Sequence, residues 1–167
     1  MTSYEKLVKS ATKFLSMTGY TEEEFQALLP YFASRFTAYV ADYTLEGKKR
    51  TRRGYVAYKN SPLPTIEDKL LFILIYLKTN NLQSVQAELF ERHQPEANVW
   101  VHILAPILNQ ALADSGHLPA RSMEELEFDQ ESILFFHDGT ERPIPRPTDD
   151  DLQKEYYSGK KTPFAQK

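Results

Sequence analysis

Apolar residues recur at intervals of three and four near the start of the chain, the spacing of one buried helical face. This pattern predicts a helix over residues 3–17, with an inward face made by Tyr4, Leu7, Val8, Ala11, Phe14 and Leu15. Thr2 and Glu5 have the spacing of a capping box, and Gly19 is suited to end the helix.

A second helix is predicted over residues 22–42, where Thr21 and Glu24 form another capping box. Its apolar face consists of Phe25, Leu28, Leu29, Phe32, Phe36, Tyr39 and Val40. Pro30 lies inside this stretch and lacks an amide proton, so we expect it to kink or divide the helix.

Two helices are predicted directly after residue 64. Thr65 and Asp68 open the first, and Asn80-Asn81 ends it. It is apolar nearly all round, through Leu70, Leu71, Ile73, Leu74 and Leu77, which is typical of the central helix of a core. A short helix follows over residues 82–90, with Val85, Leu89 and Phe90 facing inward.

A third, longer helix follows a turn at residues 91–94, with Pro95 at its first position and an end near Gly116. Its apolar residues are Val99, Trp100, Ile103, Leu104, Ile107, Leu108 and Leu112, and Pro106 should bend it. A buried helix, a short helix, a turn and a longer helix together fit a helix-turn-helix unit.

Polar residues near the start of the third helix are the candidates for contacts with bases. These are Glu96, Asn98 and His102. Asparagine pairs with adenine through two hydrogen bonds, and glutamate accepts from the cytosine amino group. The same residues would also suit the solvated face of an ordinary helix, because helical triplets are common in all-α domains. We expect Trp100 to belong to the core rather than to stack on a base.

Residues 44–62 lack helical periodicity and contain a cluster of positive charge. Its members are Lys48, Lys49, Arg50, Arg52, Arg53 and Lys59. As a DNA-binding arm, this segment would contact phosphates or enter a narrow minor groove. As a solvated loop, it would need no function, and the sequence leaves both interpretations open.

The last part of the chain combines a polar connector with one short apolar run. The run Ile133 to Phe136 predicts a strand, and Asp138 follows it. Phosphodiester cleavage through two divalent ions requires several carboxylates, so Asp138 alone cannot hold both ions. Glu141 and the run from Asp149 to Asp151 are better explained as a turn and a solvated tail. Asp138-Gly139 is also a common turn dipeptide.

Composition excludes several classes of protein. The 167 residues include no cysteine, which rules out disulfide frameworks and thiolate metal sites. No stretch has the length of a membrane span or the apolar core of a signal peptide. The net charge of −3 does not itself indicate nucleic-acid binding, so the local basic cluster is the relevant signal. We expect a cytoplasmic bacterial protein.

Several segments resemble the N-terminal part of bacterial insertion-sequence transposases of the DDE superfamily. The segments are residues 43–48 with 50–53, 61–65 with 67–74, 108–113, 134–147 and 153–161. The two most specific read His-Asp-Gly-Thr-Glu-Arg-Pro from His137 and Tyr-Tyr-Ser-Gly-Lys-Lys from Tyr156. The resemblance implies a helix-turn-helix before an endonuclease domain with a ribonuclease-H-like fold. It also implies that Asp138 is the first metal-binding aspartate and that Mg²⁺ serves the complete enzyme, while this chain binds no metal tightly.

The resemblance ends after Lys161. Relatives continue with a sequence similar to Lys-Arg-His-Ser-Leu-Lys, whereas this chain continues with Thr162 to Lys167. One shift of reading frame in adenine-rich codons interconverts the two sequences. We therefore expect a frameshifted or truncated end, which sequencing of the gene in the alternative frame would test.

The fold predicted from these observations is mainly α, with an incomplete ribonuclease-H-like α/β start. The expected regions are an N-terminal helical region at 1–43, a basic arm at 44–62, a helix-turn-helix at 63–116, a linker at 117–130 and the endonuclease start at 131–167. The predicted function is binding of double-stranded DNA at insertion-element ends, without strand cleavage by this chain alone. Alternatives are a regulator that lowers transposition, through competition or association with itself or the full-length transposase, and a helical protein-interaction module.

Overall fold

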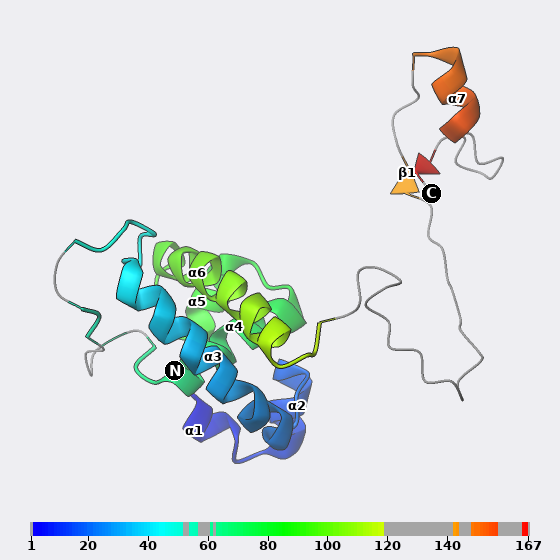
Figure 1. The fold of residues 1–167 in the computed structure, drawn as a ribbon. Helices are drawn as coiled ribbons and strands as arrows, with labels where there is room; N and C mark the ends of the chain where they lie inside the picture. Colours follow the sequence, from blue (N-terminus) through cyan, green and yellow to red (C-terminus); the bar gives the residue numbers. More distant parts are fainter. Residues whose placement is uncertain are drawn as a thin grey trace, which may run out of the picture. The chain divides into compact units, whose positions relative to one another are not determined.

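The computed structural model describes residues 2–51, 54–56, 61, 63–118, 142–143, 148–156 and 165–166. They are mainly helical, which confirms the predicted fold class. The chain divides into two compact units, Met1–Pro119 and Ala120–Lys167. The first unit contains six helices among its described residues (Figure 1). The predicted strand at Ile133–Phe136 and Asp138 lie outside the described residues.

The first predicted helix is in fact two helices, α1 (Tyr4–Leu7) and α2 (Ala11–Thr18). In one continuous helix, Tyr4 and Phe14 would lie about 15 Å apart along the axis. The break brings their ring centroids to 6.1 Å and lets Tyr4 stack on Phe25 at 5.1 Å. The burial of aromatic side chains therefore outweighs helix continuity, and Leu15 is left 46% exposed.

The ends of these two helices differ in how well the sequence predicted them. Gly19 ends α2 with a φ of 77°, as expected. The capping box of Thr2 and Glu5 is wrong, because Ser3 precedes α1 and makes no side-chain cap. The backbone N–H of Thr2 instead donates to the carbonyl of Leu89, 3.0 Å away.

Helix α3 (Glu22–Asp42) has the predicted limits and the predicted capping box. The Glu24 N–H donates to Thr21 Oγ1 at 3.2 Å, and the Thr21 N–H donates to Glu24 Oε2 at 2.8 Å. Pro30 does not divide the helix. Helix α3 packs most extensively against α6 (Gln94–Asp114), and Arg35 forms an ion pair with Asp114 at 2.5 Å.

Helix α4 (Ile66–Thr79) is buried at every position from Asp68 to Ile75, which confirms its prediction as the central helix. Its first turn is capped by Thr65, whose Oγ1 accepts from the Asp68 N–H at 3.0 Å. Asn80 ends it with a φ of 49°. Leu77 does not fill the core as predicted, because it lies beyond the buried segment and is 54% exposed.

The short helix α5 (Gln83–Leu89) is joined to α4 by a buried amide. Gln86 is fully buried, and its Nε2 donates to the carbonyl of Phe72 at 2.8 Å. The inner side of α5 is therefore made by Gln86, Ala87 and the following Phe90. The prediction that Val85 faces inward is wrong, because this side chain is 45% exposed.

Among its described residues, the second unit contains helix α7 (Asp150–Tyr156) and two short strands. Strand β1 (Arg142–Pro143) pairs antiparallel with β2 (Ala165–Gln166). The sequence did not predict α7. Its signal was Asp149, whose Oδ1 accepts from the N–H groups of Asp151 and Leu152, each at 3.0 Å.

Candidate nucleic-acid interface

The turn between α5 and α6 is built without glycine. Phe90 is fully buried at its start, and Glu91 has a left-handed φ of 54°. The N–H of Arg92 donates back to the carbonyl of Ala87 at 2.8 Å. His93 then takes an extended conformation before α6 begins at Gln94. Pro95 is consequently at the second position of α6 rather than the predicted first, where its missing N–H is equally harmless.

Helix α6 has two distinct faces in its first turns. Ala97, Trp100, Val101 and Leu104 are buried, and the burial of Trp100 confirms its prediction as a core residue. His102 is exposed, and Asn98 is half-buried on the same side of the helix. Pro106 remains inside the helix and does not break it. Of the predicted base-contacting residues, Asn98 and His102 thus share one accessible face.

Glu96 lies apart from this face. Its Oε2 is a buried atom without a hydrogen-bond partner, as is Arg92 Nε, among the described side chains. Residues 96 and 98 are two positions apart and point about 200° away from each other around a helix. The placement of Glu96 therefore argues against a direct base contact by this side chain.

An amide cluster joins the start of α5 to the start of α6. The Nε2 of Gln94 donates to Gln83 Oε1 at 3.0 Å, and the Nδ2 of Asn98 donates to the same oxygen at 2.9 Å. An open hollow of about 550 Å³ lies beside it and is lined by Asn81, Gln83 and Gln94, among others. Sequence reasoning missed Gln83 and assigned Gln94 to the turn. The available signal was an amide side chain at the first residue of both helices.

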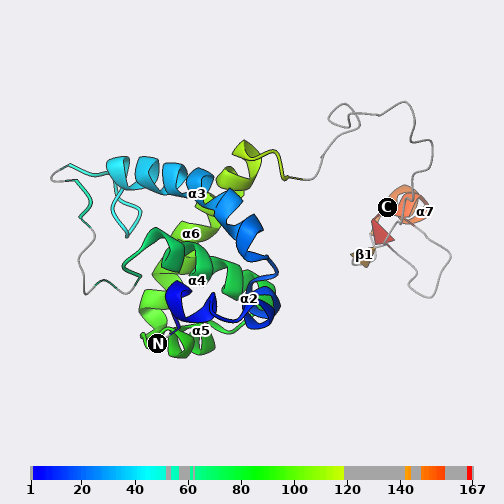
Figure 2. The same cartoon turned by 90° about the horizontal axis from the view of Figure 1, so that it is seen from below.

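The basic segment begins with a tight turn after α3. Tyr43 bridges to Lys49, and Gly47 turns the chain with a φ of 74°. Lys48 and Lys49 are exposed. Arg52, Arg53 and Lys59 lie outside the described residues. Figures 1 and 2 show the described part of this segment, in cyan, leaving the helical unit at the end of α3.

Arg50 has a structural role that the sequence did not predict. Its Nε donates to the carbonyl of Val40 at 2.9 Å, and its Nη2 donates to the carbonyl of Tyr43 at 3.0 Å. These carbonyls belong to the last turn and the end of α3, where backbone acceptors have no helical partner. The guanidinium thus closes the C-terminus of α3 and holds the turn of the basic segment.

Replacing Arg50 by methionine should lower the free energy of unfolding by about 1 kcal/mol, because two backbone acceptors lose a charged donor. Replacing the exposed Lys48 by methionine should change stability by less than about 0.5 kcal/mol. Urea unfolding followed by circular dichroism measures both effects. Equal stabilities of the two variants would contradict the role of Arg50 at the end of α3.

Lys69 anchors the other end of the basic segment to the core. This side chain is 2% exposed, and its Nζ donates to the carbonyls of Leu63 at 2.6 Å and Thr65 at 3.1 Å. The Nζ also faces the rings of Phe36 and Trp100, at 5.2 and 5.8 Å from their centroids. Burial lowers the pKa of Lys69 to about 8.

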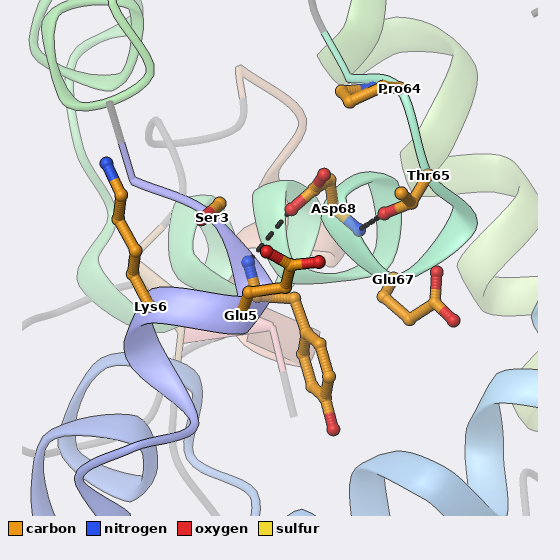
Figure 3. A pocket seen from close by; sticks show the side chains of 8 residues that line it. Ser3, Glu5, Lys6, Pro64, Thr65, Glu67 and Asp68 are labelled. Carbon is orange, nitrogen blue, oxygen red and sulfur yellow. Dashed lines mark hydrogen bonds between the residues drawn. The ribbon is translucent and has the colours of Figure 1, made fainter. Parts of the chain in front are cut away.

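A hollow of about 520 Å³ lies where the first turns of α1 and α4 face each other (Figure 3). Asp68 Oδ1 accepts from the Tyr4 N–H at 2.9 Å across it. This carboxylate therefore joins the N-terminal helices to the helix-turn-helix.

No group of three histidine or acidic residues among the described positions could hold a metal ion. No helix among the described residues is long and apolar enough to span a membrane.

Comparison with known families agrees with this geometry. Residues 61–114 match a family model described as the helix-turn-helix of DDE superfamily endonuclease. The match includes all of α4, α5 and α6 and ends at the last residue of α6. No curated protein and no solved structure matches the chain. Residues 61–114, which fold into α4, α5 and α6, are therefore similar to the helix-turn-helix of DDE superfamily endonucleases.

Proposed function

We propose that this chain binds double-stranded DNA at the ends of an insertion element as part of a DDE transposase. The observation that carries the proposal is the accessible face at the start of α6, within the segment that matches the endonuclease helix-turn-helix. The second helix of such a unit lies in the major groove with its first turns against the base edges. Asn98 and His102 are the residues that we assign to base contacts.

Positive charge from the segment after α3 would supply the contacts with phosphates. Lys48 and Lys49 are exposed and lie in the turn that directly follows α3. Arg52, Arg53 and Lys59 follow in the same segment of the sequence. Each phosphate that these side chains neutralise releases counterions, so affinity should fall steeply as salt increases.

A gel-shift titration across a salt series tests this proposal. The probes are a duplex that carries the inverted repeats flanking the gene and a shuffled duplex of equal length. Replacing Asn98 or His102 by alanine should each weaken binding to the repeats by about 1–3 kcal/mol and leave the shuffled duplex unaffected. Replacing Lys48 and Lys49 by alanine should weaken binding to both duplexes. The slope of log K against log salt concentration should become less steep by about 0.9 for each phosphate that is no longer neutralised.

Replacing Asn109 by alanine is the matched control, because this asparagine is exposed on α6 but lies about four turns beyond its start. It should bind both duplexes like the wild type. Equal affinity of the wild type for the repeats and the shuffled duplex would overturn recognition of element ends. Unchanged affinity of the Lys48 and Lys49 variant would contradict the role of the basic segment.

We also propose that Asp138 supplies the first Mg²⁺ ligand of the endonuclease and needs further carboxylates from elsewhere to complete the site. The proposal is supported by the resemblance of the segment from His137 and by the chemistry of the reaction, which needs two ions clamped about 3.5–4 Å apart. Purified chain with Mg²⁺ and the end duplex should therefore bind without cutting. Nicking that disappears in Asp138→Asn would show that the site is complete.

A further inference from the structure

We propose that Gln83 is a positioning residue that orients the amide of Asn98 and thereby gives the site a preference for adenine at the base facing Asn98. This inference rests on the proposed binding of DNA through α6. It extends that proposal from the base-contacting residues to the residue behind them. It also commits to one base, which the placement of α6 alone does not.

In the amide cluster, the side-chain oxygen of Gln83 accepts two hydrogen bonds. Gln83 is the first residue of α5, and its Oε1 accepts from both Gln94 Nε2 and Asn98 Nδ2, at 3.0 and 2.9 Å. A carbonyl oxygen has two lone pairs, so these two donors fill it. Gln83 and Asn98 are both half-buried, which strengthens the hydrogen bond between them relative to one in open water.

This contact determines which end of the Asn98 amide faces Gln83. A carbonyl oxygen accepts only, so the Asn98 group that faces Gln83 must be the NH₂ and not the oxygen. A half-turn of the amide would place two oxygens against each other and break the hydrogen bond. With the Gln83 oxygen facing it, the Asn98 amide therefore has one favoured orientation out of two otherwise similar ones.

The selected orientation leaves Asn98 with a definite pair of groups for a base. Its NH₂ has two hydrogens, of which one is donated to Gln83, so one N–H and the carbonyl oxygen remain. Adenine presents a matching acceptor, N7, and donor, N6–H, in the major groove. Guanine presents two acceptors there, so one of them would lie against the Asn98 oxygen with no hydrogen between the two acceptor atoms.

Selection of bound duplexes from a library with a fully randomised central segment tests the inference with the full chain. Asn98→Ala first identifies the base position that Asn98 reads, because the preference there disappears. Gln83→Met keeps a similar length but removes the acceptor, so the adenine preference at that position should fall about tenfold. Gln83→Glu keeps an accepting oxygen, so it should retain the adenine preference while its added negative charge lowers overall affinity.

Gln110→Met is the matched control, because Gln110 is an exposed glutamine late in α6. It should select the same sequences as the wild type, and thermal unfolding should confirm that all variants fold. The role of Gln83 would be wrong if Gln83→Met kept the full adenine preference, or if a folded Gln83→Glu lost it. Either result would leave the proposal of DNA binding intact. If the wild-type chain enriches no sequence, both the proposed specific recognition of DNA and this inference are wrong.

Discussion

Replacing Trp100 by alanine is expected to destabilise the helical unit by about 3–5 kcal/mol, the usual effect of removing a large buried aromatic side chain. Trp100 is 4% exposed and lies on the face of α6 that packs into the core. Its ring faces the Lys69 ammonium at 5.8 Å, so the replacement also removes an interaction that stabilises a buried charge. Urea unfolding followed by far-ultraviolet circular dichroism measures the loss.

Two variants on the same helix serve as controls for this prediction. Trp100→Phe keeps an aromatic ring and should lose less stability than the alanine variant. His102→Ala removes an exposed side chain two positions away and should change stability by less than about 0.5 kcal/mol. Trp100 is the only tryptophan, so its fluorescence separately reports unfolding of the wild type. Wild-type stability in Trp100→Ala would instead indicate a solvated tryptophan available for stacking.

Replacing Lys69 by methionine should lower the free energy of unfolding by about 1–3 kcal/mol. Methionine preserves the apolar stem but leaves the carbonyls of Leu63 and Thr65 without their donor, and unpaired acceptors are costly in a buried position. Lys78→Met is the control, because Lys78 is exposed in the last turn of the same helix. If both variants unfold at the same urea concentration, the hydrogen bonds of Lys69 do not contribute.

The same lysine should make stability depend on alkaline pH. Its pKa in the folded chain is about 8, whereas an unperturbed lysine titrates near about 10.4. Between these values the unfolded chain binds more protons, so the free energy of unfolding should rise as pH increases from about 8 to about 10. A pKa difference of one corresponds to about 1.4 kcal/mol. Below pH 8 both states carry the charge, and the contribution of Lys69 is constant.

Above this pH range, the ionisation of two tyrosines determines how stability changes. Burial raises the pKa values of Tyr4 and Tyr55 above their ordinary value, so their ionisation should lower stability as pH rises above about 10. The rise between pH 8 and 10 should be absent from Lys69→Met and present in Lys78→Met. A wild type whose stability is constant over this range would contradict the lowered pKa of Lys69.

Features that depend on residues close in the chain could be predicted from the sequence. The capping box of Thr21 and Glu24, the cap at Thr65 and the ends at Gly19 and Asn80 all follow from bonds or dihedrals within a few residues. The apolar residues of α4, which lie nearly all round the helix, likewise indicated its central place. Periodicity also located α6 and the burial of Trp100, because one side of a helix must face the core.

The candidate interface shows where this local reasoning stopped. Asn98 and His102 could be named from their residue types and their position early in the third helix. The different face of Glu96 was available from periodicity, because Glu96 lies one helical turn before the buried Trp100. The use of Arg50 at the end of α3 was not predictable, because it depends on how the backbone turns after the helix. Residue type alone treats every polar residue near a helix start as equally available, whereas helical periodicity separates Glu96 from Asn98.

The sequence by itself determined the positions of α3 to α6, most of their ends and the central position of α4, since hydrophobic periodicity and capping act over a few residues. Only the tertiary structure decided the break between α1 and α2, the burial of Lys69 and the joining of Gln83 to Gln94 and Asn98. The physical reason is that these features depend on partners distant in the chain. Tyr4 reaches Asp68, Lys69 faces Phe36 and Trp100, and Gln83 meets Asn98 only after the chain has folded back.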